Sequence, residues 1–454
     1  MEKLIQPKVL KGFRDILPRD AIRRDDLQEK ITKVYRSFGF VPIDTPALEY
    51  SEILLRKSEG ETEKQVFRFT DNGKRDVALR FDLTVPFARF TAEHSGELYF
   101  PFKRYHMAKV WRGEKPQAGR YREFIQCDID IIGSDSAASD FEILNVMREA
   151  FLAIGVSGIT IRVNHRGIFN RFLLRIGQIE KSEAILRAVD KIAKVGREEV
   201  GSELAKITDS DKTADLILRY VGAAGEKEKS GFADWESTLA LIEDMAGGED
   251  SDSRRMREIR AMMSALGIEA SYVLDSSVTR GLDYYTGVVY ETFLNELPSI
   301  GSVCSGGRYD NLAGLYMKNK VPGVGASIGL DRLLSALDAV SGTMQKSCYI
   351  DAEIFCLDEK LAVHYQKAAS DFRKRGVSVE VFPHAAKMNR QYVVTDAKNI
   401  PWGILIDEEA AKNNVISLKN LATRKIEVEN MTIDSACEKI KAAKNENQRE
   451  RISE

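Results

Sequence analysis

Residues 102–133 constrain the fold of this chain more than any other segment, because they predict two strands joined by a polar, basic loop. The loop contains Gly113, Pro116 and Gly119, all of which favour turns. The first strand is therefore expected to end at Arg112. The second is expected to run from about residue 121 to residue 132.

Side chains in the second predicted strand alternate strictly between two faces. Apolar residues point one way, and the opposite face carries an aromatic ring, an amide and two carboxylates: Phe124, Gln126, Asp128 and Asp130. Four charged residues stand at the loop end of the hairpin: Arg112, Glu114, Arg120 and Arg122. This set of groups is suited to holding a base, a phosphate and a small cation together.

Length and composition limit the class of protein. A chain of 454 residues is too long for one ordinary core and predicts two or three domains. The net charge of −2 does not demand a nucleic-acid partner, although it leaves room for a local basic patch. Five cysteines without CxxC spacing argue against a structural zinc site or a disulfide framework and favour a reducing compartment. We expect neither a secretory signal nor a membrane span.

The pattern along the chain predicts several elements. Apolar spacing predicts helices over 20–38 and 139–153, and the prolines of 40–46 favour an extended segment. Residues 76–85 alternate like a strand, with Arg80, Asp82 and Thr84 on one face. From 168 to 266 the chain is rich in Glu, Lys, Arg and Ala. It is interpreted as a helical insertion, or alternatively as a continuation of the first domain's helices.

Strand-like sequence resumes at residue 271 and includes the glycine-rich segment 305–310 and a strand leading into a helix at 321–334. Residues 341–343 are a plausible linker. Beyond them, strands and helices alternate over 348–440, which predicts a separate α/β unit. The charged tail of 441–454 is expected to be disordered.

Residues 325–329, Gly-Ala-Ser-Ile-Gly, match two short patterns that are poor guides to function. One is the GxSxG turn of hydrolases, which lacks a following acid and histidine within the same domain. The other is a dinucleotide fingerprint, which has one residue too many and no second strand. Close packing of small residues is the better interpretation, with Leu330, Leu333 and Leu334 burying one helix face. Arg332 points away from that face, as solvated helix residues usually do.

Together these segments resemble the class II aminoacyl-tRNA synthetases, and the histidyl-tRNA synthetases in particular. Residues 102–133 resemble motif 2 and residues 323–334 resemble motif 3. Residues 280–291, Arg-Gly-Leu-Asp-Tyr-Tyr-Thr-Gly-Val-Val-Tyr-Glu, and 305–310, Ser-Gly-Gly-Arg-Tyr-Asp, resemble the two signatures of the histidyl enzymes. Residues 39–49 resemble motif 1, which builds the dimer interface, and the C-terminal unit resembles an anticodon-binding domain.

The resemblance implies an α+β catalytic domain on a mostly antiparallel sheet (1–167 and 267–342), a helical insertion (168–266) and a C-terminal α/β anticodon-binding domain (348–440). It implies a histidine–tRNA ligase that joins L-histidine to ATP with Mg²⁺, releases pyrophosphate, and transfers histidine to the 3′ end of tRNA-His. A cytoplasmic homodimer is expected.

The resemblance also assigns site residues. The catalytic pair is Arg112 and Arg280. ATP is expected to contact Arg112, Glu114, Arg120, Tyr121, Phe124 and Arg332. Histidine is expected to contact Asp82, Leu83, Thr84, Arg112, Gln126, Asp130, Arg280, Tyr284 and Tyr285. Gln117 is the candidate for tRNA, and no residues are expected to form a dedicated metal cage.

Asp82 and Asp130 differ from many bacterial members of the family, which have glutamate at these positions. A shorter carboxylate leaves open whether the contact with histidine is direct or through water. Three other functions remain as alternatives. They are a catalytically silent regulator that binds histidine, a sensor of uncharged tRNA, and an adenylate-forming ligase that does not use tRNA.

Overall fold

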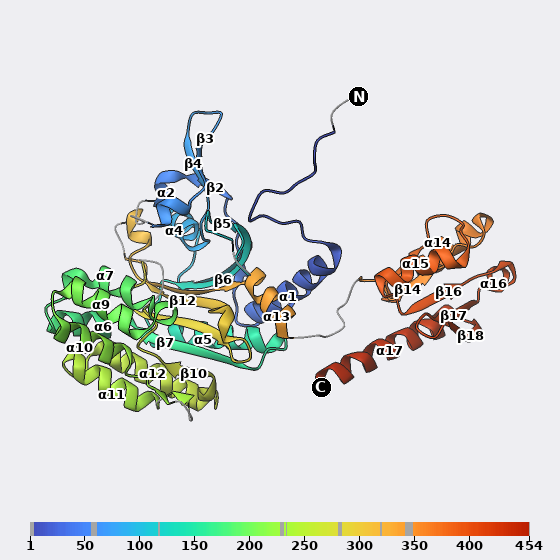
Figure 1. The fold of residues 1–454 in the computed structure, drawn as a ribbon. Coiled ribbons are helices and arrows are strands. Elements are labelled where there is room, and N and C mark those ends of the chain that lie inside the picture. Colours follow the sequence, from blue (N-terminus) through green and yellow to red (C-terminus); the bar gives the residue numbers. More distant parts are fainter. Residues whose placement is uncertain are drawn as a thin grey trace. The chain divides into compact units, whose positions relative to one another are not determined.

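The computed structural model describes residues 4–55, 61–116, 119–227, 231–232, 234–279, 284–317, 320–340 and 348–453. The chain forms two compact units (Figure 1). The first comprises Met1–Asp15 and Asp26–Gly342, and the second comprises Ile16–Asp25 and Thr343–Glu454.

An eight-stranded sheet is the centre of the first unit. Its order is β1 (Val41–Pro42), β5 (Phe102–Trp111), β6 (Glu123–Ile132), β13 (Gly323–Gly329), β12 (Cys304–Tyr309), β11 (Val288–Leu294), β7 (Ile159–His165) and β10 (Tyr272–Leu274). Only the pairs at the two edges are parallel. The mostly antiparallel sheet that the sequence predicts is therefore confirmed.

The predicted hairpin is the pair β5 and β6, aligned from Phe102 opposite Ile132 to Trp111 opposite Glu123. The predicted division of faces is confirmed for β6. Its apolar face packs into the main core with helices α1 (Pro18–Ser37) and α5 (Ala137–Ala153). Because helices cover that side, the polar side chains of β6 lie on the other face of the sheet.

Helices fill most of the chain between β7 and β10. They are α6 (Arg166–Arg175), α7 (Ser182–Val189), α8 (Ile192–Val195), α9 (Arg197–Thr208), α10 (Asp211–Val221), α11 (Trp235–Ala246) and α12 (Ser251–Ala265). The helical character predicted for 168–266 is thus observed. Their buried side chains belong to the same hydrophobic core as the sheet. The segment therefore folds together with the sheet, in the same compact unit.

A three-stranded sheet of β2 (Leu48–Tyr50), β4 (Asp76–Leu79) and β3 (Arg68–Thr70) corrects the prediction for 76–85. The strand ends at Leu79, and helix α4 (Thr84–Glu93) begins at Thr84. The polar residues between them bond to the backbone. Arg80 donates to the carbonyls of Thr45 and Lys109, and Asp82 Oδ1 accepts the N–H of Val85 at 3.0 Å. The alternation of polar residues in this segment therefore results from local hydrogen bonds to the backbone and not from a continuing strand.

The second unit is a five-stranded sheet with its own core. The strand order is β15 (Val379–Val381), β14 (Ala352–Ile354), β16 (Trp402–Leu405), β17 (Ile416–Asn420) and β18 (Lys425–Met431). Four helices accompany it: α14 (Ala362–Lys374), α15 (Met388–Lys398), α16 (Glu408–Asn413) and α17 (Ile433–Ser453). Helix α17 continues through 441–453, where a disordered tail is predicted. The Glu, Lys, Arg and Gln residues of that segment are all good helix formers.

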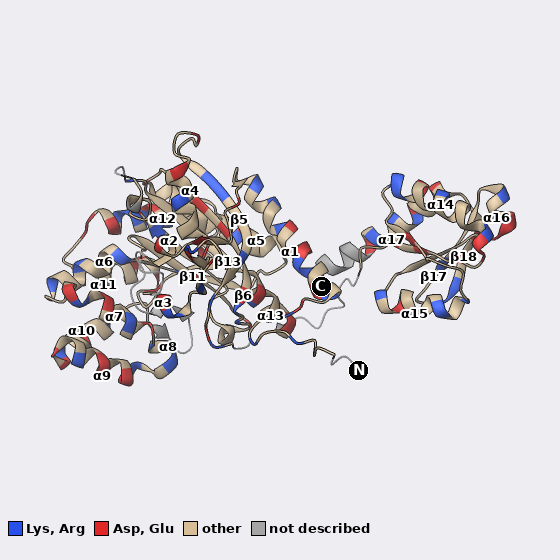
Figure 2. Cartoon of the chain, turned by 90° about the horizontal axis from the view of Figure 1, so that it is seen from above, with Lys and Arg blue, Asp and Glu red and all other residues tan. Residues whose placement is uncertain are grey.

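Charged side chains of both signs are distributed over the helices of each unit (Figure 2). Within the described ranges, no helix combines the length and the apolar character needed to cross a membrane. All five cysteines are free thiols.

Candidate active site

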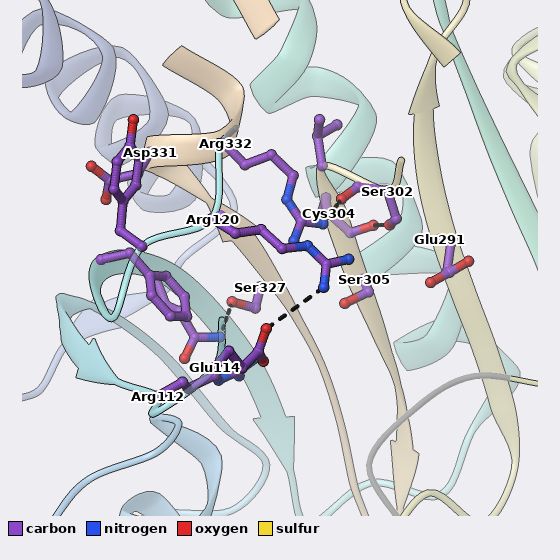
Figure 3. A pocket seen from close by; sticks show the side chains of 16 residues that line it. Arg112, Glu114, Arg120, Glu291, Ser302, Cys304, Ser305, Ser327, Asp331 and Arg332 are labelled. Atoms are coloured by element: carbon purple, nitrogen blue, oxygen red, sulfur yellow. Dashed lines mark hydrogen bonds and ion pairs between the residues drawn. The ribbon is translucent and has the colours of Figure 1, made fainter. Parts of the chain in front are cut away.

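A cavity of about 280 Å³ lies where the hairpin meets strands β12 and β13 and the start of helix α13 (Leu330–Val340) (Figure 3). The residues that line it are Arg112, Glu114, Gly119, Arg120, Tyr121, Phe124, Gln126, Glu291, Ser302, Val303, Cys304, Ser305, Ser327, Gly329, Asp331 and Arg332. All six residues predicted to contact ATP are in this set. The structure thus brings together side chains from four separate segments of the chain, 112–126, 291, 302–305 and 327–332.

Three arginines line the cavity, together with the carboxylates of Glu114, Glu291 and Asp331. The Arg112 guanidinium lies 4.3 Å from the ring centroid of Phe81 and 5.2 Å from that of Phe124, which leaves its remaining donors near the cavity. Arg120 and Arg332 extend toward the strand that carries Cys304 and Ser305 (Figure 3). Arg332 donates to the carbonyl of Ser302 at 2.6 Å, so it is not the solvated residue that helix spacing alone favours.

Asp331, which the sequence analysis did not select, joins the hairpin to α13. Its Oδ2 accepts the N–H of Ile125 at 2.7 Å, and its Oδ1 pairs with Arg14. The Arg14 guanidinium in turn lies 3.7 Å from the ring centroid of Tyr121. Asp331 could have been selected from the sequence because it is adjacent to Arg332. No sequence pattern around Arg14 indicated that it belongs to this site.

Residues 11–14 form an outer wall against the hairpin. The carbonyl of Gly12 accepts the N–H of Arg122 at 2.8 Å, and the side chain of Arg122 donates to the carbonyls of Lys11 and Glu114. Gly12 has φ +88°, and an added Cβ would lie 2.8 Å from Arg122 and 2.9 Å from Pro116. Only glycine fits this close approach without strain.

Beside the cavity, a buried polar cluster surrounds Asp130 on β6. Arg104 Nη2 lies 2.6 Å from Asp130 Oδ2, and the hydroxyl of Tyr309 donates to Oδ1. Burial raises the pKa of Asp130 to about 6, although the positive charge of Arg104 and the bond from Tyr309 act in the opposite direction. Arg104 and Tyr309 are functional candidates that sequence reasoning missed, because only strand pairing brings them to Asp130.

Tyr284 and Tyr285, predicted to contact histidine, lie against this cluster. Their ring centroids are 5.0 Å apart, and the Tyr284 ring is 5.9 Å from that of Tyr309. Burial raises the pKa of both phenols, so they are neutral hydrogen-bonding groups. Thr84, in the first turn of α4, hydrogen bonds to Tyr284.

The glycine-rich strands make room for this cluster. A Cβ on Gly325 would lie 2.0 Å from Asp130 Oδ1, and one on Gly307 would lie 2.9 Å from Tyr285. The small residues of 323–329 therefore provide clearance for Asp130, in addition to the strand–helix packing that was expected. Ser327 lies inside strand β13, so the GxSxG match is not a nucleophile turn.

The remaining predicted histidine contacts lie around the same cluster. Asp82 is buried, and its burial raises its pKa against the opposing effects of the Val85 N–H and the Arg112 charge. The carbonyl of Leu83 accepts from Arg104 at 3.3 Å. Gln126 Nε2 donates to Ser327 Oγ at 2.7 Å.

Asp128, which shares the polar face of β6 but was assigned no role, is a third buried carboxyl. Burial raises its pKa to about 7, opposed by the charge of Arg104. The sequence placed Asp128 on the correct face but gave no reason to separate it from Asp130.

Two predicted site residues, Gln117 and Arg280, lie outside the described residues. In the second unit, three basic side chains in or next to helix α15 differ in exposure. Lys387 and Arg390 are exposed, whereas Lys398 pairs with Glu380.

No group of three or more His, Cys, Asp or Glu side chains within the described part of the chain is arranged to hold a metal ion. The arginine-rich cavity does contain the carboxylates of Glu114 and Glu291. Carboxylate oxygens are ligands that Mg²⁺ accepts, commonly together with phosphate oxygens and water.

Comparison with known proteins agrees with this geometry. Residues 12–333 match the histidyl-tRNA synthetase family, and residues 351–443 match the anticodon binding domain. A histidine–tRNA ligase of Treponema denticola is 57% identical over 98% of this chain and 100% of its own length. One from Rhodopirellula baltica is 45% identical over 93% of this chain and 95% of its own.

Solved structures show the same fold. The histidyl-tRNA synthetase of Nostoc sp. PCC 7120 superposes with a TM-score of 0.84 at 29% identity, covering 97% of this chain and all of that one. A protein from Bacillus halodurans described as an ATP phosphoribosyltransferase regulatory subunit/histidyl-tRNA synthetase gives a TM-score of 0.71 at 20% identity, covering 86% of this chain and 97% of its own. At that identity the second likeness concerns the fold alone.

Proposed function

The chain belongs to the histidyl-tRNA synthetase family and is a histidine–tRNA ligase, and from that premise we propose which side chains carry its reaction. ATP is the substrate that activates histidine. In the first step the histidine carboxylate attacks the α-phosphorus, a P–O bond forms, and pyrophosphate leaves. The nucleophile is already an anion, so no general base is required. The protein therefore acts by positioning the reactants and by neutralising charge on the phosphoryl oxygens.

We assign ATP to the cavity that contains the three arginines. Phe124 stacks under the adenine, and Glu114 together with the backbone near Tyr121 reads its amine. Arg120 and Arg332 hold the outer phosphates. The single observation that carries this proposal is that all six side chains expected for ATP line one cavity of about 280 Å³.

Arg112 is assigned to the α-phosphate and the histidine carboxylate, at the junction between the cavity and the cluster around Asp130. Its Nε is held by the carbonyl of Phe81 at 3.2 Å, which fixes the plane of the guanidinium. Arg280 is its proposed partner on the strength of the 280–291 signature. Loss of one such fixed donor typically lowers kcat by about 10²–10³-fold.

Mg²⁺ fits this site, because Glu291 supplies a carboxylate beside the arginines and ATP supplies phosphate oxygens. When bound, the ion would neutralise phosphate charge. Glu291 would orient it, and Arg112, Arg120 and Arg332 would still hold the phosphates themselves.

Selection for histidine is assigned to the buried cluster. Asp130, held by Arg104 and Tyr309, accepts one imidazole N–H, and the hydroxyl of Tyr285 satisfies the other nitrogen. Asp82, Thr84 and Gln126 hold the ammonium group. An amino acid without the ring nitrogens would leave these buried groups unpaired, which lowers its use by roughly 10⁴-fold or more.

In the second step, histidine passes to the 3′ end of tRNA-His. We assign the anticodon to the second unit, where Lys387 and Arg390 offer exposed positive charge for the phosphate backbone. Gln117 keeps its predicted role at the acceptor stem. The five free thiols favour a cytoplasmic location.

A homodimer is proposed through the segment that resembles motif 1. Strands β1 and β2 of this segment carry the exposed apolar side chains of Val41, Leu48 and Tyr50, and Phe69 on β3 is also exposed. Tyr50 and Phe69 flank Val77 of β4 in the same row of the small sheet, and adjoining exposed apolar side chains are typical of protein interfaces.

The test is ATP–pyrophosphate exchange without tRNA, measured with each standard amino acid. We expect exchange with histidine alone. Absence of exchange with histidine, in folded protein that still binds tRNA, would favour the silent regulator over the ligase.

A further inference from the structure

We propose that Asp128 and Ser327 are positioning residues that fix the amide of Gln126 with its oxygen toward the substrate, so that the site accepts an ammonium group. The inference rests on the proposed placement of the ammonium group at Gln126. It adds the reason why that amide presents an acceptor and not a donor.

Strand geometry brings the three side chains together. Gln126 and Asp128 are two positions apart on β6 and therefore share one face. Ser327 on β13 is the cross-strand neighbour of Asp128 and lines the ATP cavity together with Gln126 (Figure 3). Asp128 and Gln126 are both buried, so water does not compete freely for their hydrogen bonds.

The chemistry of each group then decides the direction of the bonds. At pH 8, above the pKa of about 7 to which burial raises Asp128, its carboxylate is ionised and can only accept, so the hydroxyl of its cross-strand neighbour Ser327 donates its one proton to Asp128. With that proton committed, Ser327 Oγ can only accept from Gln126. The observed contact of 2.7 Å is accordingly the Gln126 Nε2 donating to Ser327 Oγ. The relay assigns the two ends of the amide, which shape alone cannot distinguish.

The consequence is an acceptor without a partner. Among the described residues, Gln126 Oε1 and Asp128 Oδ1 are both buried and make no hydrogen bond. A buried acceptor left unpaired is costly, so the site is incomplete without a donor. The nearby guanidinium of Arg104 pairs with Asp130 through Nη2, and its Nε and Nη1, although buried and without partners among the described residues, bond to neither oxygen. A ligand ammonium, which has three donors and no acceptor, supplies the donor that Gln126 Oε1 lacks.

The test compares three ligands by calorimetry at pH 8. L-histidine and histidinol both carry the ammonium group, and imidazole-4-propionate lacks it. We expect Asp128→Asn and Ser327→Ala to weaken histidine and histidinol by about tenfold or more. The same variants should change imidazole-4-propionate less than about twofold. Ser327→Thr keeps the hydroxyl and should restore affinity for the two amines.

Ser276→Ala is the matched control, since it removes another buried hydroxyl, which donates to the carbonyls of Tyr220 and Val221. It should leave all three affinities unchanged. If Asp128→Asn fails to fold, the single-hydroxyl variant Ser327→Ala carries the test. Equal losses for all three ligands would make the two residues merely structural and overturn the proposal.

Gln126→Ala separates this inference from the proposed function. One outcome is that Gln126→Ala weakens histidine and histidinol more than imidazole-4-propionate while Asp128→Asn and Ser327→Ala affect all three ligands alike. In that case the relay is wrong and the placement of the ammonium group stands. If Gln126→Ala itself affects the three ligands alike, the ammonium lies elsewhere and both proposals fail.

Discussion

Three carboxyl groups, two on β6 and one just before α4, lie where water cannot stabilise their charge. Asp82, Asp128 and Asp130 are all buried, and burial raises the pKa of each. Arg104 is the buried cation beside them, and it is paired with Asp130. An unliganded protein of this kind binds protons that its ligand later displaces. The buried carboxyl groups thus lower the stability of the unliganded fold, and their site is complete only when a cation is bound.

Asp128→Asn should therefore stabilise the unliganded protein more at pH 8 than at pH 5. An aspartate in the unfolded chain ionises near pH 3.9, whereas burial raises the pKa of Asp128 to about 7 in the folded protein. Between these values the folded state holds the extra proton, so the wild type loses stability as pH rises through this window. Asparagine cannot ionise and escapes that loss.

The measurement is the Tm of both proteins at each pH. The gain of the variant should be larger at pH 8, by about 2 °C or more. The groups that face Asp128 are Arg104, Asp130, Asp82 and His106, which is the cross-strand neighbour of Asp128. Both proteins in the comparison must therefore retain these four residues. An identical shift in Tm at both pH values would show that ionisation of Asp128 does not limit stability.

Arg332→Ala should lower kcat/KM for ATP in the exchange reaction by about 10²-fold, because a fixed charged donor for the phosphates is lost. Arg332→Lys should recover only part of this, since lysine cannot reproduce a planar, bidentate contact. The Kd for histidine should be unchanged in both variants. A large loss of histidine affinity would place Arg332 in the structure of the amino-acid site instead.

The placement of candidate site residues was predictable where a strand or a family motif displayed them. Phe124, Gln126 and Asp130 follow from the alternation of β6. Arg104 and Tyr309 were missed, since contact with Asp130 depends on which strands become neighbours. Sequence patterns report the spacing along one strand and contain little about its partners.

Among the elements, the hairpin was predictable because the alternation of its strands and the turn residues of its loop both indicate the same structure. Residues 76–85 show the opposite case, where alternating polar residues bond to backbone and a helix starts at Thr84. The N-terminal wall had no periodicity at all. Its conformation comes from contacts with Arg122, Tyr121 and Asp331, which are distant in sequence.

This wall leads to a prediction for Arg14, which touches both Tyr121 and Asp331. Arg14→Ala should raise KM for ATP about tenfold, because it removes a cation–π contact and an ion pair that position the hairpin. The Kd for histidine should stay constant. Lys11→Ala is the control, since only the backbone carbonyl of Lys11 is used against Arg122. If both variants behave alike, the wall does not position the ATP site.

Across the whole molecule, the order of segments was predictable from changes in composition and from linkers. It was not predictable that the helices of 168–266 share one core with the sheet. Helical spacing shows that a helix has an apolar face but not which element covers that face. The second unit has a sheet and a core of its own, in agreement with its separate α/β pattern.

Removal of residues 348–454 should leave ATP–pyrophosphate exchange largely intact while lowering aminoacylation of tRNA-His. The physical reason is that every residue lining the ATP cavity lies in the first unit. Both activities are measured on the same preparation, with the Tm of the first unit as the folding control. Equal loss of both activities would mean that the second unit supports the first one structurally.

The bond between Gln126 and Ser327 joins residues that are 201 positions apart, and it lies between strands that are neighbours in the sheet. A ribosome adds roughly 5–20 residues per second. During synthesis, β6 therefore waits on the order of 10–40 seconds before the strand that completes its edge has been made. Throughout that interval an open strand edge is available to other chains. Newly made copies of this enzyme need shielding during that interval, and cells that translate it slowly should depend most on their chaperones.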